Sequence, residues 1–163
     1  MLLALLVAFI APAGVPFEAS FRAVAGPRWV DRAAQVQAES AFNPRAVSPV
    51  GARGLAQFMP ATWAEWAPGA DPFDPLAAIR AQHRYMLWLE ARCGGDLDPA
   101  LGAYNAGLGN LRRAQRLSDS LGLPRGAWLR VLPRVTGAAH AAETAGYLTR
   151  NRRFREQIRK GAA

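Results

Sequence analysis

The helix-breaking residues of this chain are gathered into short clusters, and this distribution limits most strongly how the chain can fold. Proline and glycine crowd into NPRAVSPVG (residues 43–51), APGADPFDP (67–75) and the region 118–136, and a Gly-Gly pair stands at 94–95. The runs between these clusters are rich in good helix formers such as Ala, Gln, Leu and Arg. No convincing series of strands appears. The pattern predicts a mainly α-helical protein.

The first long run, residues 28–41, predicts an amphipathic helix. Trp29, Ala33 and Val36 recur at helical spacing and form an apolar stripe. Glu39 then lies in the last helical turn, where the proline-rich segment begins. A carboxyl group partly screened from water by apolar neighbours keeps its proton more readily and can donate it to a leaving group. Glu39 is therefore the candidate acid, and a solvated helix-end glutamate is the alternative.

Capping signals predict the remaining helices. Pro60 suits the first turn of a helix, and Asp74–Pro75 and Asp98–Pro99 are each typical of an N-cap followed by the first helical residue. After residues 28–41, the predicted elements are a short helical piece at 52–58, a helix from Pro60 that contains Trp63 and Trp66, a helix at 75–93, one opened by Asp98 and Pro99, one around 110–117, an irregular region at 118–136 and a long closing helix at 138–158.

Length and composition fit one compact domain. With 51% hydrophobic residues, 163 residues can bury a core without help from a metal or a disulfide. Cys93 is the only cysteine, which excludes an intramolecular disulfide and a zinc site with paired cysteines. His83 has no second histidine or carboxylate at ligand spacing, and no glycine-rich phosphate loop follows a strand. The sequence therefore predicts no metal and no other cofactor.

Basic residues outnumber acidic ones by 20 to 12, so polyanions are plausible partners. The C-terminal run RNRRFREQIRK (150–160) is the most basic stretch of the chain. A solvated helix face is one interpretation of this run. Binding of an anionic wall polymer or a membrane surface is a second, and nucleic acid is a less favoured third.

A stretch that begins in the last turn of the first predicted helix contains, in order, Glu39, Ser40, Phe42, Asn43, Pro44, Ala46, Ser48, Gly51, Ala52, Gly54, Leu55, Gln57, Met59, Pro60 and Thr62. This ordered set resembles the soluble lytic transglycosylase (SLT) catalytic domain of the lysozyme-like, goose-type lysozyme superfamily. The block AYNAGLG (103–109) is similar to the family's substrate-groove motif, and Glu143-Thr144 with Tyr147 is similar to its closing-helix motif. The implied domain covers residues 28–158.

Two residues depart from the family pattern. Ala56 stands where methionine is usual, and Trp63 stands where a small residue is usual. These changes alter the expected floor of the groove and leave the acid in place.

The resemblance implies a lysozyme-like single domain with a catalytic groove that cleaves the β-1,4 bond between N-acetylmuramic acid and N-acetylglucosamine in peptidoglycan. Glu39 would protonate the glycosidic oxygen and then remove the proton of the C6 hydroxyl as that oxygen attacks C1, which leaves a 1,6-anhydromuramoyl end. Most glycosidases need two carboxylates. Here one is enough, because the substrate supplies the nucleophile.

The resemblance also supplies candidate substrate-binding residues, namely Ser48, Gln57, Tyr104, Asn105, Glu143 and Tyr147. Tyr104 or Tyr147 is expected to stabilise the positive charge that develops at C1, and the amide and hydroxyl side chains suit the acetamido and hydroxyl groups of sugars. Structural alternatives are a core position for Tyr104, a helix-end cap for Asn105, a clamp on the backbone for Gln57 and a buried partner of an arginine for Glu143.

Residues 1–16 form an apolar segment that is too short to cross a bilayer comfortably as a helix of ~20 residues. It resembles a secretory signal without the usual basic residue at its start. We expect a signal or anchor segment and a location in the periplasm or cell envelope.

Two other functions stay open. In a goose-type muramidase water would attack, and Asp71 or Asp74 is the nearest carboxylate in the sequence that could activate it. In a phage-like virion or a secretion machine, the domain would be an assembly component with assembly partners. The apolar N-terminal segment and the basic C-terminal run motivate this second alternative.

Overall fold

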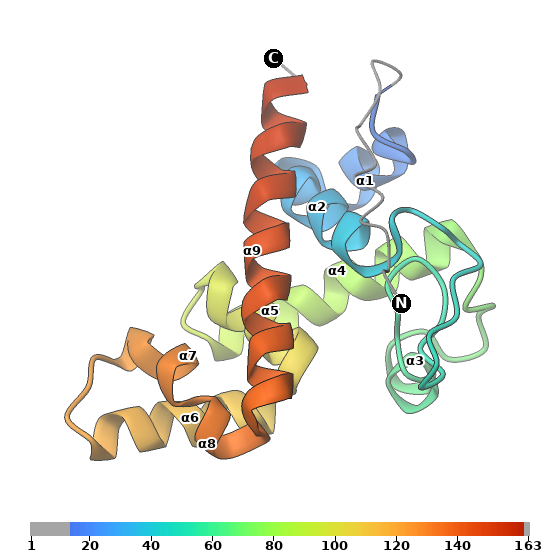
Figure 1. Cartoon of the computed structure of the whole chain (residues 1–163). Coiled ribbons are helices and arrows are strands. Elements are labelled where there is room, and N and C mark those ends of the chain that lie inside the picture. Colours follow the sequence, from blue (N-terminus) through green and yellow to red (C-terminus); the bar gives the residue numbers. More distant parts are fainter. Residues whose placement is uncertain (1–13, 162–163) are drawn as a thin grey trace, which may run out of the picture. The chain divides into compact units, whose positions relative to one another are not determined.

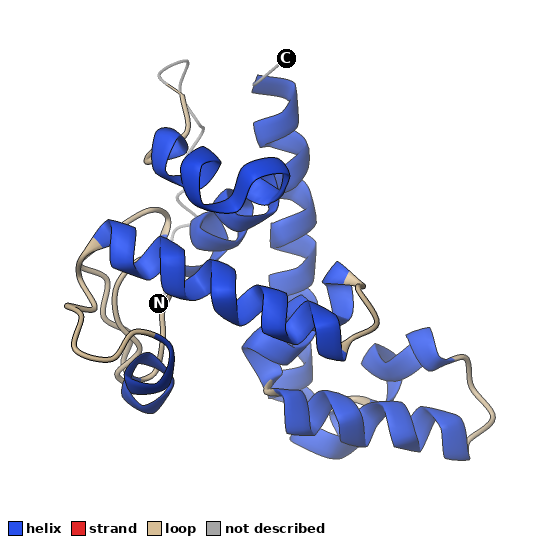
Figure 2. Ribbon diagram, turned by 180° about the vertical axis from the view of Figure 1, so that it is seen from behind, coloured by secondary structure: helices blue, strands red, loops and turns tan. Residues whose placement is uncertain are grey.

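The structure, a computed structural model that describes residues 14–161, consists of helices and connecting loops (Figures 1 and 2). The α-helices are α1 (Glu18–Ala25), α2 (Trp29–Ser40), α3 (Pro60–Trp66), α4 (Pro75–Arg92), α5 (Leu97–Ala106), α6 (Leu108–Ser120), α7 (Trp128–Val131), α8 (Pro133–Thr136) and α9 (Ala138–Gly161), and the 3₁₀-helices are η1 (Gly26–Arg28) and η2 (Arg125–Ala127). Within 14–161 the only β-structure is two isolated bridges. The predicted mainly α architecture is confirmed.

Most of the predicted N-terminal signal or anchor segment, residues 1–13, lies outside the described residues. Among the helices that are described, none combines the length and the apolar character that a membrane span requires. The described chain divides into two compact units. Unit 1 holds the residues up to Ala81 together with those from Arg153 onward, and unit 2 is Gln82–Arg152.

The core of unit 1 includes the helix pair α1 and α2. Trp29, Ala33 and Val36 are all buried, as the apolar stripe predicts. The ring of Phe21 on α1 meets that of Phe42 edge to face, with centroids 6.2 Å apart. Helix α1 was not predicted from the sequence. Its packing against α2 is a tertiary contact that short-range pattern does not reveal.

The predicted short helix at 52–58 was wrong, because these residues form a turn. Arg53 makes antiparallel bridges with Val47 and with Phe58. Gly54 and Gln57 have φ angles of +71° and +49°, in the left-handed region that a right-handed helix cannot include. The backbone of this segment therefore folds back on itself.

In unit 2, α5 packs on α6, and α6 packs on α7 and α8. Helix α5 begins at Leu97, earlier than predicted, because its N-cap is Asp96 rather than Asp98. The Asp96 carboxylate accepts a hydrogen bond of 3.2 Å from the Asp98 backbone N–H. The predicted irregular region at 118–136 contains the short helices η2, α7 and α8. These helices have three or four residues each, too few to show a helical period in the sequence.

The other helix predictions are confirmed. Pro60 begins α3, and α9 extends the predicted closing helix to Gly161. Asp74 caps α4, since its Oδ1 atom accepts hydrogen bonds from the backbone N–H groups of Leu76 (2.8 Å) and Ala77 (3.3 Å).

Candidate active site

Glu39 lies in the last turn of α2, as predicted, and is half-buried. The helix ends abruptly just beyond it, because Ala41 and Phe42 have φ angles of +50° and +61°. Two consecutive non-glycine residues in the left-handed region are uncommon and require support from their surroundings. The buried ring of Phe42 supplies some of that support. The backbone just beyond the candidate acid is therefore anchored by a buried side chain.

Ser40 ties this helix end to the loop that follows. Its hydroxyl lies 2.8 Å from the carbonyl oxygen of Leu55 and 3.3 Å from that of Val36 in the preceding helical turn. A hydroxyl has one proton, and the shorter distance favours Leu55 as its acceptor. The link joins residues 15 positions apart and fixes the loop next to Glu39.

The loop from residue 41 to residue 59 is also held by two of the predicted substrate-binding residues. Gln57 Nε2 donates to the carbonyl oxygens of Gly54 (2.9 Å) and Ala46 (3.2 Å), so this side chain does clamp the backbone. Ser48 Oγ accepts a hydrogen bond of 3.0 Å from the Ala52 N–H. The Gln57 side-chain oxygen and the Ser48 hydroxyl proton are engaged by no other described residue, so both remain available to a ligand.

The two positions that depart from the family pattern are both buried. Ala56 is 1% exposed and Trp63 is 8% exposed. The Trp63 indole N–H donates to the Ala70 carbonyl oxygen at 2.9 Å, and its ring packs against Phe58 with centroids 5.9 Å apart. Trp63 is thus part of the packing of unit 1.

The carboxylates that a water-activating mechanism would need are engaged with the backbone. Asp71 Oδ1 accepts from the Phe73 N–H at 2.9 Å, and Asp74 caps α4. Both side chains are exposed. Their contacts explain them as turn and cap residues. Within residues 14–161, no group of three or more His, Cys, Asp or Glu side chains could hold a metal ion.

Unit 2 contains the other predicted substrate-binding residues. Tyr104 and Asn105 are half-buried near the end of α5, and the Tyr104 ring packs against Tyr85 with centroids 5.3 Å apart. Asn105 is not the helix-end cap. Asn110 takes that part, since its Nδ2 atom donates to the Ala106 carbonyl oxygen at 2.6 Å.

A hydrogen bond connects the AYNAGLG block with the closing-helix motif on α9. Thr144 Oγ1 lies 2.8 Å from Asn105 Oδ1, and Thr144 is fully buried. Tyr147 is also buried, at 1% exposed. Glu143 is exposed, so it is not the buried partner of an arginine. From the sequence, Thr144 could be recognised only as a member of the motif, because its partner Asn105 lies 39 residues away.

Comparison with known proteins identifies a family. Residues 33–122 match the family described as Transglycosylase SLT domain. The chain is 39% identical over 109 residues to the membrane-bound lytic murein transglycosylase F of Pasteurella multocida, covering 63% of this chain and 22% of the relative. It is 30% identical over 149 residues to the protein of the same name from Shewanella frigidimarina, covering 80% of this chain and 31% of the relative.

Solved structures show the same likeness. The 70-kDa soluble lytic transglycosylase from Escherichia coli superposes with a TM-score of 0.73 at 27% identity, covering 90% of this chain and 25% of that one. A complex of the 70-kDa soluble lytic transglycosylase with bulgecin A gives a TM-score of 0.74. The chain thus spans about a quarter of the length of the structures it resembles.

Proposed function

Because the chain belongs to the family of transglycosylase SLT domains, we propose that it is a peptidoglycan lytic transglycosylase with Glu39 as its catalytic acid. The position of Glu39 carries the proposal. Glu39 is half-buried in the last turn of α2, and the hydrogen bond of Ser40 to Leu55 holds the following loop next to it. The relatives named above, of which this chain spans only a part, are lytic transglycosylases and support the same reaction.

In this mechanism Glu39 acts twice. It first gives its proton to the glycosidic oxygen, and the bond from that oxygen to C1 of the muramoyl residue breaks. As a carboxylate it then takes the proton of the C6 hydroxyl while the C6 oxygen bonds to C1. Glu39 ends the cycle protonated, and the new glycan end is a 1,6-anhydromuramoyl group. No second carboxylate is required, which agrees with the structural roles of Asp71 in a turn and of Asp74 at the start of α4.

The substrate-binding residues remain part of the proposal. Ser48 and Gln57 offer a hydroxyl proton and an amide oxygen to the sugar, and Asn105 offers its amide. Tyr104 or Tyr147 stabilises the charge at C1, and Glu143 on α9 contacts the substrate. The named relatives do not favour the alternatives of a muramidase or an assembly component.

The direct test compares Glu39→Gln with a matched carboxylate variant. Glu65→Gln removes a carboxylate from an exposed position on α3 of the same unit. Purified proteins are incubated with peptidoglycan sacculi, and soluble muropeptides are quantified by mass. We expect release at least about 100-fold slower for Glu39→Gln, the range for a lost general acid, and wild-type release for Glu65→Gln. Equal release by wild type and Glu39→Gln would contradict the proposal.

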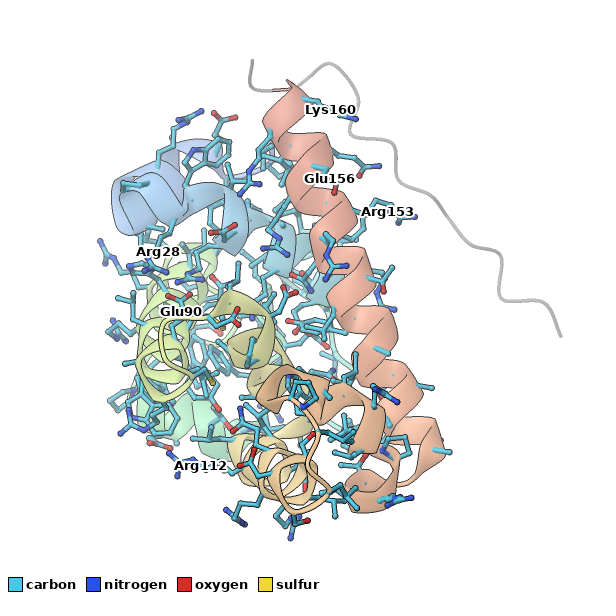
Figure 3. All side chains as sticks on the ribbon, turned by 90° about the vertical axis from the view of Figure 1, so that its left-hand side faces the viewer. Arg28, Glu90, Arg112, Arg153, Glu156 and Lys160 are labelled. Carbon is cyan, nitrogen blue, oxygen red and sulfur yellow. The ribbon has the colours of Figure 1, made fainter. Side chains whose placement is uncertain are left out.

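The relatives and the charge of the chain suggest a location in the cell envelope. Arg153 and Lys160 are exposed on α9 and project from one side of it together with Glu156 (Figure 3). Arg159 pairs with Asp31 at 3.6 Å. We propose that Arg153 and Lys160 attract anionic wall polymer or a membrane surface.

Retention of the protein on purified anionic wall polymer should fall as the salt concentration rises. It should be lower for the variant Arg153→Gln/Lys160→Gln than for Arg112→Gln/Arg116→Gln, which lowers the net charge by the same amount on α6. Equal retention of the two variants would contradict a role for α9.

A further inference from the structure

The hydrogen bond between Thr144 and Asn105 makes the orientation of an α5 side chain depend on α9. Thr144 is completely buried, whereas Asn105 is half-buried near the end of its helix. The Thr144 hydroxyl oxygen lies 2.8 Å from Asn105 Oδ1 and 3.0 Å from the carbonyl oxygen of His140. The His140 carbonyl lies one turn earlier in α9, where it also accepts a backbone N–H within the helix. Asn105 Oδ1 is therefore the nearer of the two acceptors, and unlike the His140 carbonyl it takes no part in the hydrogen bonds of the helix.

This bond gives the asparagine amide a direction. An amide side chain offers an acceptor on its oxygen branch and two N–H donors on its nitrogen branch. In Asn105 the oxygen branch is bound to Thr144. The nitrogen branch donates to no described residue and is not fully buried, so its N–H groups reach solvent. Toward a ligand, Asn105 therefore presents donors and not an acceptor.

We propose that Thr144 is a positioning residue that fixes Asn105 as a hydrogen-bond donor toward the substrate. The complementary group is a carbonyl oxygen. Both sugars of peptidoglycan carry one in their acetamido groups, so this inference rests on the proposed function. Without the Thr144 hydroxyl, neither orientation of the amide is preferred, and the reversed amide turns its oxygen toward the acetamido oxygen. Thr144 thereby determines the preference for N-acetylated sugars without touching them.

The test measures binding of two ligands by calorimetry. One is an N-acetylglucosamine oligomer, and the other is a β-1,4-linked glucose oligomer of the same length, which lacks acetamido groups. Thr144→Val keeps the size and branching of the side chain but removes the hydroxyl. We expect it to weaken binding of the N-acetylated oligomer about five- to tenfold and to leave the glucose oligomer unchanged. Thr144→Ser restores the hydroxyl and should bind within about twofold of wild type.

A second variant checks the polarity of the amide. Asn105→Asp keeps an oxygen for Thr144 and replaces the donors with another oxygen, so we expect it to lose at least as much affinity for the N-acetylated oligomer as Thr144→Val. Wild-type affinity in Asn105→Asp would show that an acceptor faces the ligand and would overturn the proposal. Equal losses for both ligands in Thr144→Val, or no loss for either, would also overturn it.

The outcomes separate this inference from the proposed function. If wild type releases muropeptides from sacculi while Thr144→Val binds the N-acetylated oligomer normally, only the role of Thr144 is wrong. If wild type neither releases muropeptides nor binds the oligomer, the proposed function fails, and the inference fails with it.

Discussion

Of the two glycines in the loop beside Glu39, Gly54 lies closer to another part of the backbone. A Cβ atom at this position would lie 2.0 Å from the carbonyl oxygen of Pro72, and the φ angle of Gly54 is +71°. Gly51 in the same loop has a φ of +90°, but a Cβ there would meet nothing within 4 Å. Both glycines therefore have a backbone conformation that is unfavourable for other residues. Only at Gly54 would a side chain also collide with the Pro72 carbonyl oxygen.

This difference predicts unequal costs for alanine. Gly51→Ala should lower the free energy of unfolding by about 1–2 kcal/mol, the cost of a left-handed alanine. Gly54→Ala should cost that amount plus about 1–3 kcal/mol, because the Pro72 backbone must move. Urea unfolding of the two variants and wild type checks this. Equal costs would mean that the loop accommodates the methyl group.

At the residue scale, helical period and motif order are the features that the sequence shows directly. The stripe of Trp29, Ala33 and Val36 predicts the helix, and the structure places Glu39 in the last turn of that helix, as predicted. The left-handed conformation of Gln57 could not be predicted, because glutamine carries no signal for it. The hydrogen bond of Thr144 to Asn105 could not be predicted either, since the two residues are distant in the sequence.

Among the helices, the packing of α5 depends on one glycine. A Cβ at Gly102 would lie 2.4 Å from the ring of Trp128, which is buried on α7. Alanine is the better helix former by about 1 kcal/mol, so local preference and packing oppose each other here. The absence of a side chain lets the indole ring lie directly on the helix backbone.

We predict that packing wins. Gly102→Ala should be destabilising by about 1–3 kcal/mol despite its helix propensity. Gly109→Ala on α6 has open space around it and should be neutral or stabilising by up to about 1 kcal/mol. Thermal unfolding measures both. A stabilised Gly102→Ala variant would show that Trp128 can shift without cost. In that case the effects of Gly102→Ala and Trp128→Phe on the free energy of unfolding should add in the double variant.

Predictions of whole elements succeeded where caps and period agree. Pro60 and Asp74 begin α3 and α4 as predicted, because proline and aspartate have specific uses at helix starts. The Asp98 prediction failed because Asp96, two residues earlier, offers the same cap. The segment 52–58 failed for a different reason, since good helix formers were overridden by two left-handed residues.

For the whole molecule, composition and motif order predicted the mainly α architecture and the family. The distribution of helix breakers gave the helix content, and the residues from Glu39 to Thr62 gave the resemblance that the family match supports. The compact units were beyond sequence reasoning, because their bounds depend on which helices contact each other.

We propose that Glu39 serves a reaction in which the substrate's own C6 hydroxyl attacks C1. Digesting sacculi with the wild-type protein in water enriched in heavy oxygen tests this most directly, because only hydrolysis takes an oxygen atom from the solvent. We expect this mechanism to give new muramoyl ends that carry no heavy oxygen and are lighter than hydrolysed ends by one water. One heavy oxygen atom at each new end would contradict it and identify a muramidase.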